Sequence, residues 1–120
     1  MTDAAPETDT DCLFCRIVAG EIPSTTVLET ETVVAFRDIA PEAPTHVLVV
    51  SRAHHVDVSA VAAASPTLLA EMIDVAQRVA DRECGGQFRL IFNVGPEAGQ
   101  SVPHAHAHVL GGAPMGRVLP

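Results

Sequence analysis

Apolar and polar positions alternate with a helical period in one long stretch of the chain. Between Ser65 and Gly86 six apolar residues recur at helical spacing, Leu68, Leu69, Met72, Val75, Ala76 and Val79, and charged residues occupy the other side. Apolar residues three and four positions apart form one face of an amphipathic helix. Ser65 is a suitable N-cap, Pro66 suits the first helical position, and Gly85 suits the C-terminal end. We therefore predict one long helix that covers one face of a sheet.

Shorter segments have the composition of strands, rich in β-branched and apolar residues. They span residues 27–29, 32–36, 46–50 and 88–93. Thr30 and Glu31 separate the first two, which predicts an early hairpin. Residues 12–18 are predicted to form a short N-terminal helix that ends before Gly20 and Pro23. Two prolines within residues 38–44 require a loop there, because proline fits neither a helix interior nor a central strand.

Connections between these strands are mostly short, and only one long helix is inserted among them. A parallel sheet would need a crossover helix between most neighbouring strands. The pattern therefore favours an α+β domain with an antiparallel sheet. With 120 residues, the chain is long enough for one domain with a modest core. We assign residues 11–120 to this domain and residues 1–10, which are acidic and lack apolar periodicity, to a disordered tail.

Three histidines at two-residue spacing, His104, His106 and His108, precede Val109 and Leu110. This is the period of a strand, so we expect all three imidazoles on one face. At a rise of about 3.3 Å per residue, the outer two lie roughly 13 Å apart, which makes His106 the natural centre of a site. A purely structural role would be costly for three buried polar rings. Metal ligation by His106 remains an alternative, since alternating histidines also hold metal ions.

The segment before the histidines is rich in groups that bind anions. Asn93 is followed by a Gly/Pro loop at 94–99 and then by Gln100 and Ser101. Backbone N–H groups, an amide and a hydroxyl beside imidazoles suit a phosphate. A neutral imidazole is also a competent nucleophile at phosphorus. The site therefore predicts a two-step displacement in which His106 takes the phosphoryl centre and water releases it.

Charge and composition narrow the class of ligand. The net charge is −8 and there are only seven Lys and Arg residues, which argues against a protein that holds nucleic acid through its phosphates. One nucleotide remains a possible ligand, because a few backbone N–H groups can hold it. No apolar stretch has the length of a membrane span, and residues 1–11 lack the features of a signal peptide. We therefore expect a cytoplasmic protein without membrane association.

Three cysteines complete the candidate chemistry. Cys12 and Cys15 form a C-x-x-C pair. In a reducing compartment such a pair indicates a metal site or redox chemistry before a structural disulfide, although two packed thiols remain an alternative. Cys84 stands alone at the end of the predicted long helix, and we expect it to be an inert small apolar residue.

The histidine row resembles the signature of the histidine triad (HIT) superfamily, in which three histidines alternate with apolar residues. Residues 12–23, 35–50 and 99–112 are similar to its nucleotide-binding branch, so the resemblance covers about residues 12–112. The dinucleoside polyphosphate hydrolases of the superfamily share the triad, but the ending Leu110-Gly-Gly112 favours the nucleotide-binding branch. The resemblance implies a five-stranded antiparallel sheet with helices and a homodimer. It also implies hydrolysis of purine nucleoside 5′-phosphoramidates through a nucleotidyl-histidine intermediate.

The resemblance also implies roles for individual residues. His106 is the expected nucleophile, His108 and Ser101 lie near the phosphate and the leaving group, and His46 lies behind the nucleophile. The expected nucleotide contacts are Asn93, Gly99 and Gln100 with Ser101, His106 and His108 on the phosphate side, Asp38 at the ribose hydroxyls, and Phe14, Ile17, Ile22 and Ile39 around the base.

In zinc-carrying members of the superfamily, two cysteines and two histidines form a closed site. The matching residues here are Cys12, Cys15, His54 and His104, and four such ligands make a structural zinc site with no open position. The resemblance thus implies a structural zinc ion, no cofactor for catalysis, and a His104 that is withdrawn from the chemistry.

Two departures from the branch concern the surroundings of the triad. Pro103 precedes the triad and cannot donate a ladder hydrogen bond, so we expect the strand to start there or to lie at an edge. The chain after Gly112 lacks the tryptophan-containing end of the branch. The identity of the leaving group is therefore unassigned. Two other functions are retained as alternatives. One is a nucleotide-binding regulatory module with incidental hydrolysis, and the other is a metalloenzyme that uses the triad as ligands.

Overall fold

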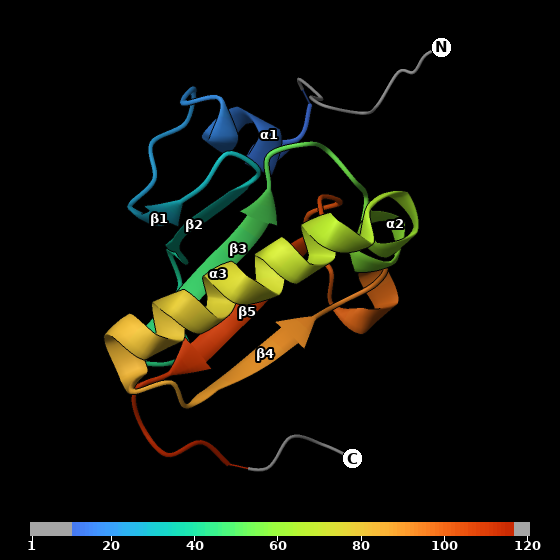
Figure 1. Ribbon diagram of the computed structural model, residues 1–120. Helices are drawn as coiled ribbons and strands as arrows, with labels where there is room; N and C mark the ends of the chain where they lie inside the picture. Colours follow the sequence, from blue (N-terminus) through green and yellow to red (C-terminus); the bar gives the residue numbers. More distant parts are fainter. Residues whose placement is uncertain (1–10, 117–120) are drawn as a thin grey trace.

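The computed structural model describes residues 11–116, so the predicted tail at 1–10 and the last residues, 117–120, lie outside the described part (Figure 1). The described residues form five strands: β1 (Thr26–Glu29), β2 (Val33–Arg37), β3 (Thr45–Ser51), β4 (Phe88–Phe92) and β5 (His106–Gly111). They also form helices α1 (Leu13–Val18), α2 (Val58–Ala64) and α3 (Pro66–Cys84) and a short 3₁₀ turn, Pro96–Ala98. The predicted hairpin, long helix and short N-terminal helix are confirmed.

The five strands make one antiparallel sheet in the order β1-β2-β3-β5-β4. The histidine strand β5 therefore lies between β3 and β4. The register of the pairing places four residues in one row across β2, β3, β5 and β4: Phe36, Leu48, His108 and Ile91. The α+β fold class predicted from the sequence is confirmed, and the triad stands near the middle of the sheet.

Helix α3 covers one face of this sheet, as Figure 1 shows where it crosses in front of β3 and β5. Five residues of the predicted apolar pattern are buried: Leu68, Met72, Val75, Ala76 and Val79. Leu69 is partly buried against the same core, and Ala80 is a further buried residue. They pack with the alternate residues of the strands, among them Val47, Val49, Ala107 and Val109. The α3 face of β5 thus carries small and aliphatic side chains, and this leaves the histidines on the opposite face.

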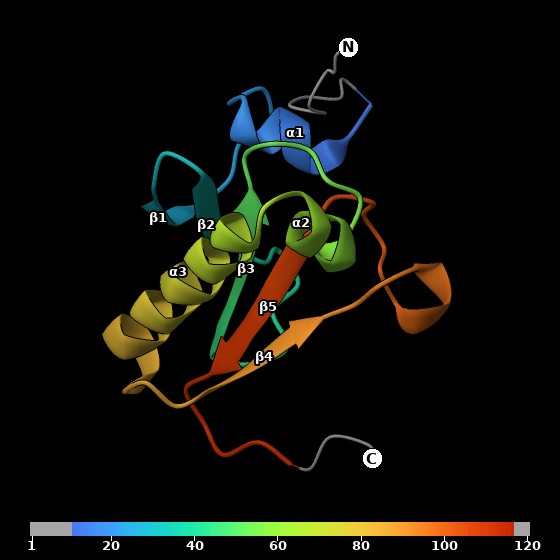
Figure 2. The same ribbon diagram turned by 45° about the vertical axis from the view of Figure 1, so that its right-hand side comes forward.

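Helix α1 lies against that opposite face, near one end of the sheet (Figure 2). Phe14 and both cysteines Cys12 and Cys15 pack with Val34, Phe36, Leu48 and Val50 in a second buried cluster. The rings of Phe14 and Phe36 meet edge to face with centroids 5.6 Å apart. Six residues are too few for a stable isolated helix, so α1 depends on this packing.

Helix α2 was absent from the sequence prediction. Asp57 caps it, because its carboxylate accepts a hydrogen bond of 2.8 Å from the backbone N–H of Ala60. Only Val61 is buried, so the segment has no apolar stripe that would reveal a helix. The following helix begins as predicted, since the Ser65 hydroxyl accepts from the N–H of Leu68 and Pro66 occupies the first turn. Gly85, with φ of 64°, ends α3 in the left-handed conformation.

The histidine strand starts later than the sequence predicted. β5 begins at His106, opposite Val50, and β3 ends one residue further at Ser51. The N–H of Ala105 donates instead to the carbonyl of His55 at 2.7 Å. His104 therefore precedes the strand, although it is completely buried. Its position outside the ladder agrees with the restriction that Pro103 imposes.

One ion pair connects β2 to the C-terminal end of α3. Both guanidinium nitrogens of Arg37 donate to Glu83, at 2.9 and 2.7 Å. The Arg37 hydrogen bond is the main cause that lowers the pKa of Glu83, and Glu83 in turn raises the pKa of Arg37. A folded-state pKa below the unfolded value means that this stabilisation is present above about pH 4.3 and is lost as the pH falls through the folded-state pKa.

We expect Glu83→Gln to lower Tm at pH 7 by about 2 to 4 °C, because a solvent-exposed pair contributes at most about 1 kcal/mol. The guanidinium side chain is 44% exposed, so high salt should reduce the difference. Thermal unfolding of both proteins from pH 7 to pH 3 measures the effect. The two Tm values should converge below about pH 4, and a constant difference over this range would contradict the assignment.

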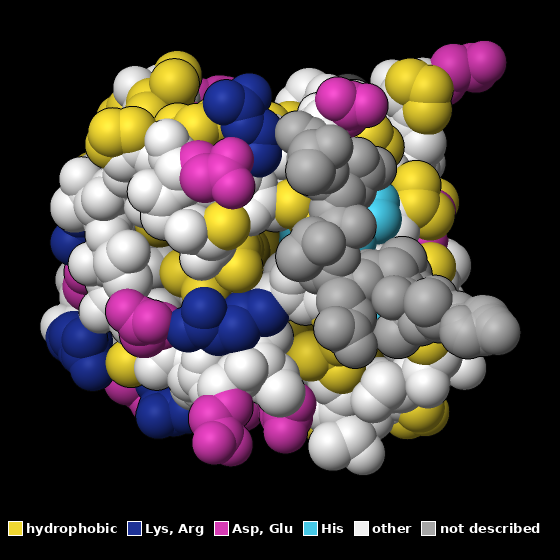
Figure 3. Space-filling model, turned by 90° about the horizontal axis from the view of Figure 1, so that it is seen from above, with side chains coloured by type: hydrophobic (Ala, Val, Ile, Leu, Met, Phe, Trp, Pro, Cys, Tyr) yellow, Lys and Arg dark blue, Asp and Glu magenta, His cyan; other side chains and the backbone are white. Residues whose placement is uncertain are grey.

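The surface in Figure 3 shows acidic and basic side chains interspersed over the face, with a small area of histidine exposed at one place. Among residues 11–116, no helix combines the length and apolar character needed to cross a membrane.

Candidate active site and zinc centre

His106 is the central histidine of the site, and its hydrogen bond defines its tautomer. Its Nδ1 lies 2.7 Å from the carbonyl oxygen of His104. A carbonyl only accepts, so Nδ1 must carry the proton and donate it. Nε2 of the neutral ring then has an unshared electron pair. The arrangement is therefore that of a nucleophile whose reactive nitrogen needs no deprotonation.

The surroundings of His106 favour this neutral form. Its side chain is only 6% exposed. Burial is the main cause that lowers the pKa of His106, while the hydrogen bond to His104 and the charge of Asp38 act in the other direction. The edge of the Phe14 ring packs against the imidazole with centroids 5.0 Å apart. Helix α1 thus forms one wall beside His106.

His46 and His108 form a hydrogen-bonded pair next to His106. Nε2 of His46 lies 3.0 Å from Nδ1 of His108, and the backbone N–H of Glu42 donates to Nδ1 of His46 at 3.0 Å. His46 therefore has its proton on Nε2, facing Nδ1 of His108. When His108 accepts this hydrogen bond, its own proton lies on Nε2. Burial, followed by the neighbouring His106 and His46, lowers the pKa of His108, which favours the neutral ring.

Asp38 lies at the end of β2 and faces the same pair. One carboxylate oxygen accepts the N–H of Ala40 at 2.8 Å, and the other lies 3.3 Å from Nε2 of His46. The first contact fixes the carboxylate in a turn. Asp38 is predicted to contact the ribose, and only the His46 ring separates it from His108.

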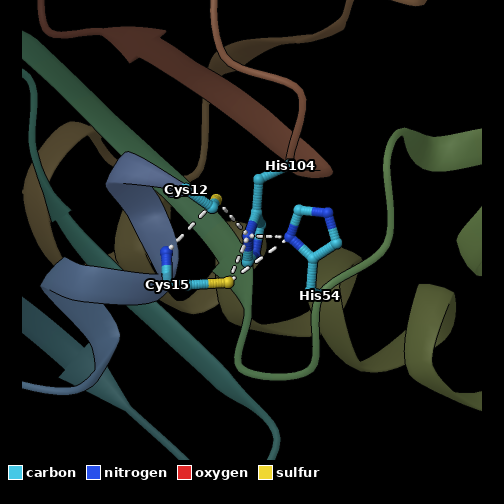
Figure 4. A group of neighbouring side chains, drawn as sticks. All are labelled: Cys12, Cys15, His54 and His104. Carbon is cyan, nitrogen blue, oxygen red and sulfur yellow. Dashed lines mark hydrogen bonds between the residues drawn. The ribbon is translucent and has the colours of Figure 1, made fainter. Parts of the chain in front are cut away.

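The four predicted metal ligands converge at the N-terminal end of α1 (Figure 4). Nδ1 of His104 lies 3.3 Å from Sγ of Cys12, 3.5 Å from Sγ of Cys15 and 3.3 Å from Nδ1 of His54. Sγ of Cys15 lies 3.3 Å from Nδ1 of His54. Ligands about 2.0 to 2.3 Å from a tetrahedral zinc ion lie about 3.3 to 3.8 Å from one another, so the four donor atoms fit zinc.

The protonation of His104 suits a metal ligand. Its Nε2–H donates to the carbonyl of Ser51 at 2.7 Å, which leaves the electron pair of Nδ1 toward the cysteines. Burial, above all, lowers the pKa of His104 to about 4. The ring therefore stays neutral at pH 7 and offers its electron pair.

Asp38, His46 and His108 also lie close enough to be considered as metal ligands. The ring geometry separates the two groups. The centroids of His46 and His108 are 5.3 Å apart with nitrogens at 3.0 Å, whereas those of His54 and His104 are 5.0 Å apart with nitrogens at 3.3 Å. The first pair is therefore aligned nitrogen to nitrogen, as in a hydrogen bond. In the second pair, the two nitrogens do not lie on the line that joins the ring centroids. Their electron pairs can therefore point to one position beside both rings.

The loop before β5 is held by Gln100, whose amide was predicted on the phosphate side. Its Oε1 accepts the N–H of Gly95 at 2.8 Å, and its Nε2 donates to the carbonyls of Val56 and Val102 at 2.6 and 3.0 Å. These bonds use the amide to shape the loop. Gly99 adopts a positive φ of 97°, which favours glycine, and the side chain of Asn93 lies beside it. Ser101 is exposed.

The predicted base-binding residues fall into two places. Ile17 and Ile22 line a depression of about 280 Å³ together with Val34 of β2. Phe14 is buried between His106 and Phe36, and Ile39 is fully exposed, with an exposure of 100%. Phe36 was not among the predicted site residues. Its place in a strand next to Asp38 is the signal that could have found it.

A five-stranded antiparallel sheet, a helix on each face and alternating histidines on a central strand define the class of histidine triad proteins. The HIT domain matches residues 19–115, and the chain therefore belongs to the HIT family. The chain is 40% identical to the purine nucleoside phosphoramidase of Escherichia coli K12 over 111 residues, which are 91% of this chain and 93% of that protein. An uncharacterised HIT-like protein of Synechocystis is 41% identical over 106 residues, covering 88% and 93% of the two chains.

Solved structures show the same relationship. A HIT family hydrolase from Clostridium thermocellum superposes with a TM-score of 0.88 at 38% identity, over 94% of this chain and all of that one (100%). One from Legionella pneumophila has a TM-score of 0.83 at 43% identity, over 88% and 96% of the two chains. The protein is thus a nucleotide hydrolase of the histidine triad type.

Proposed function

We propose that the protein hydrolyses purine nucleoside 5′-phosphoramidates through a nucleotidyl-histidine intermediate on His106. The observation that carries this proposal is the hydrogen bond from Nδ1 of His106 to the His104 carbonyl, which leaves Nε2 as a neutral nucleophile. The similarity to the purine nucleoside phosphoramidase of Escherichia coli supports the choice of substrate.

In the first step, the electron pair of His106 Nε2 forms a bond to phosphorus while the P–N bond of the substrate breaks. The amine leaves with the electron pair of that bond and takes up a proton from solvent. Water then attacks the phosphorus and returns a proton to solvent, and the P–Nε2 bond breaks with its electron pair on nitrogen, which gives the neutral imidazole and a nucleoside monophosphate. Splitting the displacement in this way replaces one difficult step by two easier ones.

Groups around His106 would hold the phosphate in this reaction. The Nε2–H of His108 would donate to a phosphate oxygen when His46 donates to Nδ1 of the same ring. The Ser101 hydroxyl and the Asn93 amide would lie on the leaving-group and phosphate sides. Gly99 permits close approach of the backbone, and Gln100 acts by keeping the loop in shape. Donors fixed in place before the charge develops stabilise it without reorganisation.

The rest of the nucleotide would extend along α1. Asp38 would accept the ribose hydroxyls, and the base would lie among Phe14, Ile17 and Ile22. Ile39, which is fully exposed without a ligand, would be covered by the base. Burial of these apolar surfaces would contribute binding free energy that does not depend on the leaving group.

We also propose that Cys12, Cys15, His54 and His104 hold a structural zinc ion. The four donor atoms lie within 4.8 Å of one another. Four protein ligands would fill the tetrahedral coordination of zinc, so no coordination position would remain for a substrate. The ion would tie α1 to the start of β5, and catalysis would need no cofactor. We further propose a homodimer, because β4 lies at one edge of the sheet and could meet a second chain there. Sedimentation at micromolar concentration measures the oligomeric state. We also propose a cytoplasmic location.

Hydrolysis of adenosine 5′-monophosphoramidate, followed by mass spectrometry after rapid acid-free quenching, tests the proposed function. We expect steady turnover and a transient adduct of one adenylyl group on the peptide that contains His106. Tight binding of AMP with negligible turnover of phosphoramidates would instead indicate a nucleotide-binding module. Faster turnover of a diadenosine polyphosphate than of the phosphoramidate would indicate a dinucleoside polyphosphate hydrolase.

A further inference from the structure

His46 has a single proton to donate and two acceptors that face it. Its Nδ1 accepts the N–H of Glu42, so this nitrogen carries no proton and the ring has one only, on Nε2. Nε2 lies 3.0 Å from Nδ1 of His108 and 3.3 Å from a carboxylate oxygen of Asp38. The two contacts therefore compete for one hydrogen bond.

Both acceptors are held in place by other parts of the fold. The N–H of Ala40 fixes the Asp38 carboxylate, and His108 lies in the ladder between Leu48 and Ile91. These contacts hold both acceptors beside Nε2 of His46. The charges of Asp38 and Glu42 both raise the pKa of His108, against burial and the nearby rings of His106 and His46, which lower it. Asp38 therefore acts on His108 through space as well as through His46.

The outcome of this competition determines the tautomer of His108. When His46 donates to Nδ1 of His108, that nitrogen must be an acceptor, and the His108 proton stays on Nε2, where it can donate to a phosphate. When His46 donates to Asp38, no neighbour fixes the His108 tautomer. A fraction of the molecules would then turn a lone pair toward the phosphate, where a donor is needed.

We propose that ribose binding at Asp38 directs the His46 proton to His108 and so couples recognition of the ribose diol to the phosphate-binding tautomer of His108. A carboxylate that already accepts two hydroxyl hydrogen bonds is a weaker acceptor for a third donor. The inference rests on the proposed function, in which Asp38 accepts the ribose hydroxyls. It identifies ribonucleotide phosphoramidates as the substrate class, because a 2′,3′-dideoxy nucleotide leaves the competition in place.

Nitrogen-15 NMR of the imidazoles tests the coupling without turnover, with AMP and 2′,3′-dideoxy-AMP as probes. We expect AMP to bring His108 fully to the Nε2–H tautomer and dideoxy-AMP to leave it mixed. Asp38→Ala, which removes the competitor, should show the Nε2–H form without any ligand. An identical His108 tautomer in the free protein, in both complexes and in the variant would overturn the proposal.

Kinetics separates this role of Asp38 from simple ribose binding. For the wild-type protein, the dideoxy phosphoramidate should have a higher KM and also a kcat roughly three- to tenfold lower, which is the net effect of one hydrogen bond. In Asp38→Ala the two substrates should have equal kcat. A difference confined to KM in the wild type would show that Asp38 only binds ribose, and the coupling would be wrong.

Asp74→Asn is the matched control, because Asp74 is an exposed aspartate on α3 whose ion pair with Arg78 lies away from the histidines. It should keep the wild-type ratio of the two kcat values. If the wild-type protein turns over neither phosphoramidate, the proposed function fails, while the NMR comparison of AMP with dideoxy-AMP still decides the coupling.

Discussion

Replacing His106 with alanine is expected to lower turnover of an adenosine phosphoramidate by about 10⁴-fold or more, because the covalent step loses its nucleophile. The ring is packed between Phe14 and His108, with centroids 5.0 and 5.2 Å away, so the fold should survive the loss of one side chain. Steady-state kinetics measures the effect, and thermal unfolding checks that the variant is folded.

His55→Gln is the appropriate control for this variant. His55 is another half-buried histidine near the site, and its backbone carbonyl, which accepts from Ala105, is kept in the glutamine variant. We expect this variant to keep its turnover. Turnover by a folded His106→Ala protein at more than about a hundredth of the wild-type rate would exclude the covalent mechanism, since general acid–base help alone gives effects of that size.

Replacing Cys15 with serine is expected to have the largest effect on stability. Loss of one ligand would weaken zinc binding and leave polar groups of the buried cluster without their ion. A loss of about 3 kcal/mol corresponds to roughly 10 °C in Tm for a chain of this size. Calorimetry of the wild-type protein with and without a chelator should show a decrease of similar size, and the chelator should add little in the variant.

Cys84→Ser provides the control for the thiol itself. Cys84 lies at the C-terminal end of α3 and packs near Gly111. Burial raises the pKa of its thiol, so it is not a reactive thiolate. We expect a small change in Tm and an unchanged response to the chelator. Metal analysis should give one zinc per chain in the wild type. Zinc-free protein with the same Tm as the loaded protein would contradict the structural role.

The periodic parts of the chain could be predicted from sequence because one local rule determined each of them. The stripe of α3 and the caps at Ser65 and Gly85 all indicate the same helix, and the hairpin of β1 and β2 follows from its composition. The histidine spacing predicted the shared face correctly. The resemblance supplied the metal ligands, which the structure brings together from α1, the loop after β3 and the segment before β5.

What the sequence could not give depends on contacts between distant segments. The strand starts at His106 because the N–H of Ala105 bonds to His55, a contact across the fold that no local pattern contains. The same holds for Gln100. Sequence placed its amide at the phosphate, whereas in the structure the amide bonds to three backbone groups. The tautomers also depend on tertiary contacts, since Glu42, His104 and Ser51 determine which nitrogen keeps a proton.

Helix α1 and its N-cap carry the two candidate metal ligands Cys12 and Cys15 and the Phe14 ring beside His106, yet His104 is 92 residues away from Cys12 in the chain. Closing so long a loop costs entropy before the contact forms, and contacts of this kind slow folding. The sheet and α3 share a core that is separate from the cluster under α1. During synthesis, the pocket would therefore be completed only after β5 has emerged.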